Sequence, residues 1–125
     1  MKIELDNTLK HPYRINSYEQ GLIQIGNDRF VSSVIITPSN IIDNWQPQTF
    51  VDIALHHLDQ ILEMKPDLIL LGTGRRQHFP DNDLFLKIAQ LNIGFEVMDT
   101  GAACRSYNVL LQEERNVAAA LLMIE

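Results

Sequence analysis

Two apolar segments in the second half of the chain, each followed at once by small and polar residues, constrain the fold more than any other feature of this sequence. Residues 68–71 form a continuous apolar run that ends at Gly72, as expected of a strand buried on both faces. Residues 95–98 are predicted to form the next strand, and a helical stretch separates the two. A helix between two strands predicts a parallel pair joined by a right-handed crossover, and therefore an α/β fold.

Apolar residues recur at helical spacing in three stretches around these strands. The first runs from residue 50 to residue 63; Thr49 and Asp52 resemble a capping box at its start, and Pro66 stops it. The second follows the helix-starting residues 80–83 and is closed by Gly94, and the third covers about residues 102–114. The three apolar stripes consist of Val51, Ala54, Leu55, Leu58 and Leu62; of Leu84, Ile88 and Leu91; and of Ala103, Cys104, Tyr107, Leu110 and Leu111.

The two ends of the chain are predicted to add further strands. Residues 15–25 and 30–37 favour strands, and the turn residues 26–28 between them indicate a β-hairpin that Pro38 ends. Residues 1–14 are expected to form an irregular arm or an edge strand. The apolar residues 117–124 would also suit a helix, but we expect a central strand. The prediction is one three-layer domain over residues 1–125, with a central mixed β-sheet flanked by helices and an N-terminal β-hairpin.

Charge and length exclude several classes of function. Ten basic and sixteen acidic side chains give a formal net charge of −6, which argues against a nucleic acid or an anionic membrane as the main partner. The first residues lack the features of a signal peptide, and the longest apolar run, residues 117–124, is too short to cross a bilayer. The single cysteine, Cys104, fits a reducing compartment. We therefore expect a soluble cytoplasmic protein.

Polar residues follow both predicted parallel strands, whose carboxyl ends should lie at one edge of the sheet. Open α/β sheets bind ligands there, and glycines, hydroxyls and guanidiniums are suited to hold an anion. A site for a small anion or metabolite is one hypothesis. Its candidate ligand-binding residues are Gly72, Thr73, Gly74, Arg75, Arg76, Asp99, Thr100, Gly101 and Arg105.

A structural interpretation of the same residues stands beside this one. The glycines of residues 72–74 serve equally well to make a sharp turn, and the two arginines that follow serve as solvated loop charges. The loop has neither the full phosphate-loop pattern nor the full dinucleotide fingerprint. Residues 99–102 match the Asp-Thr-Gly-Ala tetrad of retroviral-type aspartic proteases, but a helical stripe follows instead of a strand. Capping of that helix by Asp99 or Thr100 is the structural alternative.

Three other residue types invite a functional interpretation, and for each a structural role is favoured. Cys104 lies within an apolar stripe, which predicts a packed, inert thiol. His56 shares a predicted helix face with Asp52, Asp59 and Glu63, where a solvated acidic surface is favoured over a metal site. Trp45 is either a residue packed on the core or an exposed anchor for a partner, and packing is favoured.

Several segments together resemble the Mth938-like domain family, a family of unknown function. The resemblance covers about residue 15 to the end and rests above all on residues 98–110, with residues 30–38, Trp45, residues 71–74, Arg115 and residues 117–121 in support. Ser106 and Glu114 stand where members commonly carry Thr and Gly. The second difference is expected to change how the third helix ends, because Gly is the usual left-handed cap.

The resemblance implies a three-layer fold with a central mixed sheet and additional N-terminal β structure. It also implies kinship with eukaryotic proteins that help to assemble mitochondrial respiratory complex I, and with one associated with fat-cell differentiation. It carries over no catalytic residue, cofactor or metal site. The favoured hypothesis is a non-enzymatic interaction or assembly module with a protein partner, for which a homodimer stays open; it predicts an exposed apolar patch that includes Trp45 or part of the hairpin. The alternative is the anion or metabolite site described above, with or without enzymatic activity.

Overall fold

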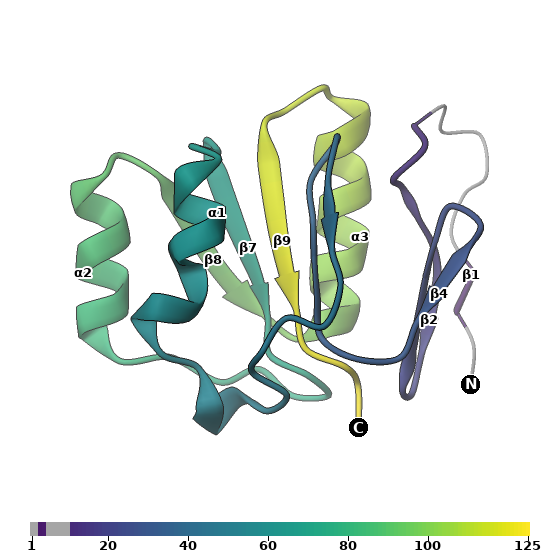
Figure 1. Cartoon of the computed structure of the whole chain (residues 1–125), viewed down its shortest axis with the longest axis horizontal. Helices are drawn as coiled ribbons and strands as arrows, with labels where there is room; N and C mark the ends of the chain where they lie inside the picture. Colours follow the sequence, from purple (N-terminus) through teal and green to yellow (C-terminus); the bar gives the residue numbers. More distant parts are fainter. Residues whose placement is uncertain (1–2, 5–10) are drawn as a thin grey trace.

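The computed structural model describes residues 3–4 and 11–125, which form two β-sheets with helices between and outside them (Figure 1). The strands are β1 (Ile3–Glu4), β2 (Ile15–Glu19), β3 (Leu22–Ile25), β4 (Asp28–Phe30), β5 (Val34–Ile36), β6 (Ile41–Ile42), β7 (Leu68–Gly72), β8 (Gly94–Met98) and β9 (Val117–Leu121). The α-helices are α1 (Asp59–Glu63), α2 (Asn82–Gln90) and α3 (Thr100–Gln112), and the 3-10 turns are η1 (Phe50–Asp52) and η2 (Leu55–Leu58).

The central sheet has five strands in the order β6-β5-β9-β7-β8. β7 runs parallel to both β8 and β9, whereas β5 is antiparallel to β9 and to β6. Gly72 at the end of β7 is paired with Met98 of β8 and with Leu121 of β9, so three carboxyl ends lie at one edge of the sheet. The parallel arrangement of residues 68–71 and 95–98 is confirmed, and residues 117–121 form the predicted central strand.

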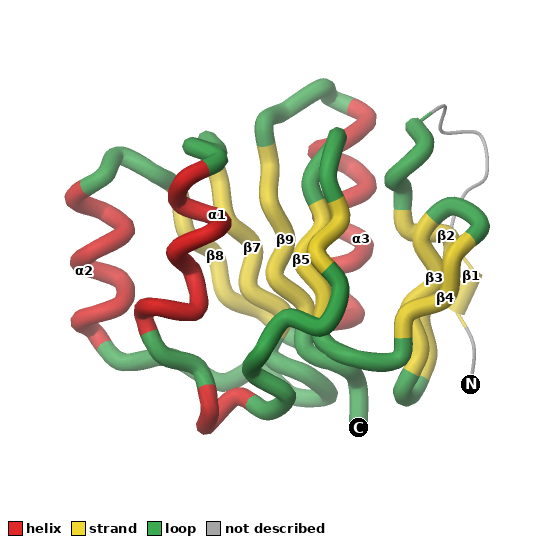
Figure 2. Tube along the Cα trace, viewed as in Figure 1, coloured by secondary structure: helices red, strands yellow, loops and turns green. Residues whose placement is uncertain are grey.

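Each face of the central sheet has its own layer of helices (Figure 2). In β7 the side chains of Leu68 and Leu70 pack in one core cluster with α3, while Ile69 and Leu71 pack in a second cluster with α1 and α2. Every residue of β7 and β9 is buried. These layers confirm the predicted α/β fold class. They also explain the continuous apolar run of residues 68–71, because a strand covered on both faces needs apolar side chains on both.

The N-terminal residues differ from the predicted single hairpin. They form a four-stranded antiparallel sheet, β1-β2-β3-β4, that packs on α3 on the side away from the central sheet. Residues 15–25 form two strands, because the chain turns at Gly21, where φ is +72°. The turn at residues 26–27 is the predicted one, between β3 and β4. Ile3–Glu4 is an edge strand; residues 1–2 and 5–10 of the predicted arm lie outside the described residues.

The segment predicted as the second hairpin strand, residues 30–37, is divided between the two sheets. Its first residue ends β4, and residues 34–36 form β5, which pairs with β9 in the central sheet. All three side chains of β5 are buried. Burial on both faces requires a central strand, which explains why this part of the segment leaves the hairpin.

The predicted helix over residues 50–63 is wrong in its first half. The structure has two 3-10 turns, η1 and η2, separated by extended backbone at Ile53 and Ala54, and only residues 59–63 are α-helical. Two side chains compete for the backbone of this segment. The Trp45 indole N–H donates to the His57 carbonyl (2.9 Å), and the Ala54 N–H donates to Nδ1 of His57 (2.9 Å). Such contacts stabilise a non-helical path that periodicity does not reveal.

The ends of α2 and α3 use left-handed residues other than glycine. Asn92, with φ of 59°, follows α2, whereas Gly94, predicted to close this helix, is the first residue of β8. Glu114 adopts φ of 60° after α3. The helix therefore ends in the left-handed conformation that glycine usually supplies, and the expected change in its ending does not occur.

Candidate functional site

The two predicted site loops meet where β7 and β8 end, and a threonine fills the space between them. The Gly74 N–H donates to Oγ1 of Thr100 (2.8 Å), and the Thr100 N–H donates to the Gly74 carbonyl (2.9 Å). The Thr100 hydroxyl in turn donates to the Leu122 carbonyl (2.7 Å). Thr100 is fully buried. We call this arrangement of Gly72, Gly74, Thr100 and Leu122 the Thr100 junction; it is closed to solvent around the threonine side chain.

Both glycines of this loop are required by the junction. A Cβ on Gly72 would lie 2.9 Å from Oγ1 of Thr100 and 3.1 Å from Cδ2 of Leu121. Gly74 has φ of +97°, which L side chains rarely adopt. Thr73 between them donates to the Arg76 carbonyl (2.5 Å) and accepts from the His78 N–H (3.2 Å). The structural interpretation of this Gly-Thr-Gly sequence is thereby supported residue by residue.

Asp99 begins the helix that follows β8. Its Oδ1 accepts from the Ala102 N–H at 2.9 Å, which is the N-cap hydrogen bond of α3. The predicted capping role of Asp99 is confirmed. The helix that follows also separates this site from the retroviral-type aspartic proteases, which continue from their tetrad into a strand.

Two of the three arginines of the predicted site, Arg75 and Arg76, line one pocket. Arg75 and Arg76 are exposed and line a surface pocket of about 330 Å³ together with Thr73, Gly74 and His78. Arg105 instead donates from Nη1 to the Tyr18 hydroxyl, and its guanidinium carbon lies 5.9 Å from the centre of that ring. Asp99, Thr100, Gly101 and Arg105 do not line the pocket that holds Arg75 and Arg76.

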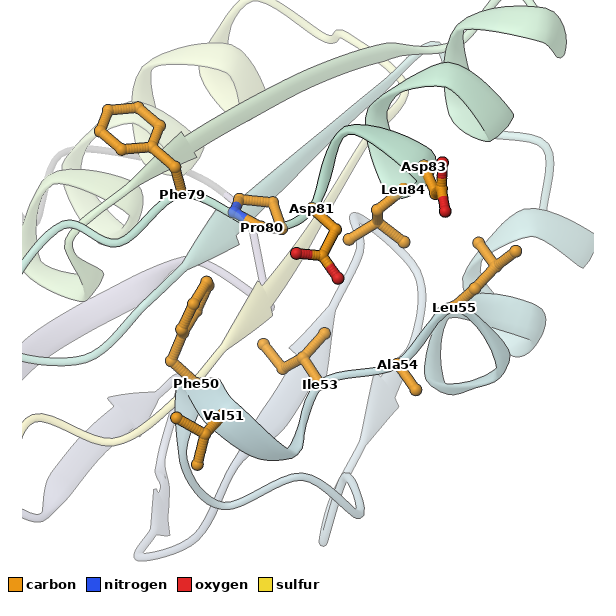
Figure 3. A pocket seen from close by; sticks show the side chains of 10 residues that line it. All are labelled: Phe50, Val51, Ile53, Ala54, Leu55, Phe79, Pro80, Asp81, Asp83 and Leu84. Carbon is orange, nitrogen blue, oxygen red and sulfur yellow. The ribbon is translucent and has the colours of Figure 1, made fainter.

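A second pocket, of about 470 Å³, adjoins the first and is mostly apolar. It lies between the η1–η2 segment and the start of α2; in Figure 3 the side chains of Ile53, Asp81 and Leu84 face one another across it. Val51 is 87% exposed and Phe79 is 73% exposed. Both belong to the wall of this pocket.

The two pockets share Phe50 and Val51, so we describe them as one rim groove. The Phe50 ring stacks on His78 with their centres 4.9 Å apart. The charged residues of the groove differ between its two ends: one end is lined by Arg75, Arg76 and Glu125, and the other by Asp81 and Asp83. The rim groove is lined by Gln48, Thr49, Phe50, Val51, Ile53, Ala54, Leu55, Thr73, Gly74, Arg75, Arg76, His78, Phe79, Pro80, Asp81, Asp83, Leu84, Leu122, Met123 and Glu125.

Sequence reasoning missed the apolar residues of the rim groove. Val51 was assigned to a buried helical stripe, and Phe79 belonged to no motif. The one available signal is Phe79 itself, an aromatic residue in a loop that is otherwise polar. Trp45, in contrast, is buried with 3% of its surface exposed, so its predicted packing role is confirmed and it is not part of an exposed patch.

Two candidate residues remain, the Cys104 thiol and the His56 side chain. Cys104 is fully buried, so its predicted packing is confirmed, and burial raises the pKa of its thiol to about 12. His56 does not share one helix face with Asp52, because the segment between them is broken at Ile53 and Ala54. Among residues 3–4 and 11–125, no three His, Cys, Asp or Glu side chains are grouped closely enough to hold a metal ion.

Comparisons with known proteins agree with this architecture. A protein-family model described as "Protein of unknown function (DUF498/DUF598)" matches residues 15–122. The solution structure of a Bordetella pertussis protein described as a Mth938-like domain is similar with a TM-score of 0.81 and 28% sequence identity. That similarity covers 98% of this chain and 92% of the other.

The names of two relatives describe different kinds of protein. NADH dehydrogenase (ubiquinone) 1 alpha subcomplex assembly factor 3 of Xenopus tropicalis is 32% identical over 105 residues, which are 82% of this chain. The match covers 56% of the assembly factor, so the chain spans about half the length of that relative. The "13 kDa major membrane protein" of Francisella tularensis subsp. holarctica is 25% identical over 118 residues, 94% of this chain and 96% of that protein. Within the part of the chain that the structure describes, no helix is long and apolar enough to span a membrane.

Proposed function

The chain belongs to the DUF498/DUF598 family of proteins of unknown function and has the Mth938-like fold, and from this premise we propose that it is a non-enzymatic module that binds another protein during the assembly of a larger complex. The observation that carries the proposal is the rim groove, where Val51 and Phe79 expose most of their apolar surface. Exposed apolar surface around a concave site is typical of protein-binding sites. The assembly-factor relatives support the same class of function.

The polar residues beside the groove favour binding over catalysis. Thr100 and Asp99 are occupied by hydrogen bonds within the fold, and the Cys104 thiol is buried and protonated. A catalytic site requires a nucleophile or a general base that can reach a substrate. These three residues are instead part of the internal structure.

Site-specific photo-cross-linking in cells of the native organism tests the proposal. A benzoylphenylalanine at position 51 should give a discrete adduct with another protein, because it lies in the groove. The matched control is the same probe at Val109, which is 60% exposed on α3, and it should give no such adduct. Adducts that are absent at position 51, or equal at both positions, would overturn the proposal. An adduct between two copies of the chain would replace it by a homodimer.

A second candidate function is a small-anion or metabolite site at the basic end of the groove. The observation that favours it is that Gly74, Arg75 and Arg76 line one pocket. Of the other candidate residues, Arg105 does not line this pocket and donates to the Tyr18 hydroxyl. Thermal shift with phosphate and citrate tests this function: a rise in melting temperature that Arg76→Ala abolishes supports it, and no shift with either anion contradicts it.

The place of the protein in the cell is part of the proposal as well. We propose a cytoplasmic protein, on the ground that its lone cysteine fits a reducing compartment and its acidic net charge disfavours anionic lipid. Cell fractionation tests this location directly. Recovery in the membrane fraction after a salt wash would contradict it and would agree with the name of the Francisella relative.

A further inference from the structure

The rim groove has a polarity that restricts what can occupy it. We infer that it binds a linear segment of a partner protein in which an acidic residue, a bulky apolar residue and a basic residue follow one another. This inference rests on the proposed function, since it names the chemistry of the protein partner. It is carried by three properties of the groove: its apolar centre, the difference in charge between its ends and its extent.

The centre of the groove is apolar and open. Phe50 and Val51 belong to both pockets, and Ile53 and Leu84 continue the apolar wall into the larger one (Figure 3). Val51 is 87% exposed, so a bulky apolar side chain placed here would remove surface from water on both molecules. A segment without such a residue would leave this surface uncovered.

The two ends of the groove differ in charge. The smaller pocket is lined by Arg75 and Arg76 together with Glu125. The larger pocket has the carboxylates of Asp81 and Asp83 and no basic residue in its lining. The adjacent arginines are notable in a chain that has ten basic and sixteen acidic residues. Complementary charges fix the direction in which a bound segment lies, so its acidic residue belongs at the arginines and its basic residue at the aspartates.

The extent of the groove favours a polypeptide segment over a free anion. Two adjoining pockets of about 330 and 470 Å³ offer room for several consecutive side chains. A phosphate or a free carboxylate would contact only the basic end and would leave Phe79 exposed. Concave pockets in a row are also the form that linear segments recognise, with one side chain in each.

Selection from a random library of linear peptides tests the inference with the intact protein as bait. We expect the enriched peptides to share an acidic and a bulky apolar residue a few positions apart, followed by a basic residue. The double variant Arg75→Glu/Arg76→Glu should weaken the best peptide by about tenfold or more, because it places like charges together. Exchange of the acidic residue of that peptide for Lys should restore binding to this variant.

Matched variants separate the groove from general charge and surface effects. Arg115→Glu changes an exposed arginine at the opposite edge of the central sheet and should leave peptide binding unchanged. Val51→Ser should abolish binding, whereas Leu86→Ser, at an apolar residue 60% exposed on α2, should not. Competition by phosphate or citrate alone, without effect of Val51→Ser, would assign the site to a free anion and overturn the inference.

The failure of this inference is distinguishable from the failure of the proposed function. Enriched peptides without an acidic residue, or no enrichment, overturn the inference, while a specific protein adduct at position 51 in cells would still support a protein-binding module. Absence of that adduct overturns the proposed function itself. A concentration-dependent dimer that Val51→Arg dissociates would assign the groove to a second copy of the chain and overturn the inference.

Discussion

The Thr100 junction and the rim groove lie at the same edge of the central sheet, yet they are built in opposite ways. At the junction, polar groups from two loops bond to one another around a fully buried threonine. In the groove, apolar side chains line an open surface, and Val51 and Phe79 are left largely uncovered. Thr100 and Asp99, which resemble ligand-site residues, are thus used within the fold, whereas Arg75 and Arg76 lie with the apolar residues on the open surface.

The difference teaches where function is to be sought in this fold. A fully buried hydroxyl that already donates one hydrogen bond and accepts another is out of reach of a ligand. Surface apolar residues contribute little to stability, because they are nearly as exposed to water in the folded chain as in the unfolded one. Substitutions at the buried Thr100 should therefore change stability, and substitutions at the exposed Val51 should change binding alone.

The largest effect is expected for Thr100→Val. Valine has nearly the same shape but no hydroxyl, so the Gly74 N–H and the Leu122 carbonyl would lose their buried partner. We expect the free energy of unfolding to fall by about 2–4 kcal/mol, measured by urea denaturation. Thr100→Ser keeps both hydrogen bonds and should cost about 1 kcal/mol for the lost methyl group. Equal losses for the two variants would contradict the closed junction.

A smaller loss is expected for Gly72→Ala. The added methyl group would lie 2.9 Å from Oγ1 of Thr100 and 3.1 Å from Cδ2 of Leu121, and both neighbours are buried. Overpacking of this kind costs about 1–3 kcal/mol in the free energy of unfolding. If the variant is as stable as the wild type, the loops are not in the close contact on which the comparison rests.

Asp99→Ala should cost about 1 kcal/mol, the usual value of an N-cap. Its carboxylate accepts the Ala102 N–H of α3, and alanine cannot. Asp99→Asn is the matched control, because asparagine caps helices equally well and removes only the charge. A loss for Asn as large as that for Ala, seen in thermal or urea unfolding, would show that the charge of Asp99 has a role beyond the cap.

Acidification should loosen one wall of the groove without affecting the junction. Partial burial lowers the pKa of His57 below its ordinary 6.5, and the nearby His56 lowers it further. Asp52 has a smaller effect in the opposite direction. Because the unfolded chain then binds the proton more readily, this ring contributes stability above pH 6.5 that is lost as the pH falls below that value. Protonation also removes the Nδ1 acceptor of the Ala54 N–H. An NMR titration should show both groups moving together with a pKa below 6.5; a value at or above 6.5 would contradict this.

The smallest change in stability is expected for Val51→Ser. The side chain is 87% exposed, so its loss should alter the free energy of unfolding by no more than about 0.5 kcal/mol. The same variant should abolish partner binding, which is the reverse of the behaviour expected for Thr100→Val. A destabilisation comparable to that of Gly72→Ala would mean that Val51 belongs to the core and that the groove is not open.

The central part of the fold was predictable because the hydrophobic pattern of its residues indicates which of them are buried. The apolar runs at residues 68–71 and 117–121 indicate strands that are buried on both faces. The apolar stripes of the helices indicate which face of each helix packs on the sheet. Residues 50–58 were not predictable in this way. Their apolar spacing suits a helix, and the contacts that prevent one come from Trp45 and from the His57 ring, whose positions depend on the tertiary structure.

The place where the two loops meet was predictable from the sequence, but the role of the residues in them was not. The position of two loops at one sheet edge followed from the crossover, and the structure brings Gly74 and Thr100 together there. Whether a threonine faces a ligand or fills the space between two loops depends on distances of a few tenths of an ångström, which residue types do not encode. The direction of Arg105 likewise depends on Tyr18, from the other sheet.

The position of β9 between β5 and β7 has a consequence for how the protein is made. β9 is antiparallel to one neighbour and parallel to the other, so it alone joins the early half of the central sheet to the later half. A ribosome that has translated everything up to residue 116 has produced both flanks but not the strand between them. Until residues 117–121 leave the exit tunnel, the apolar edges of both flanks have nothing to pair with, and the nascent chain depends on chaperones or on speed to avoid aggregation.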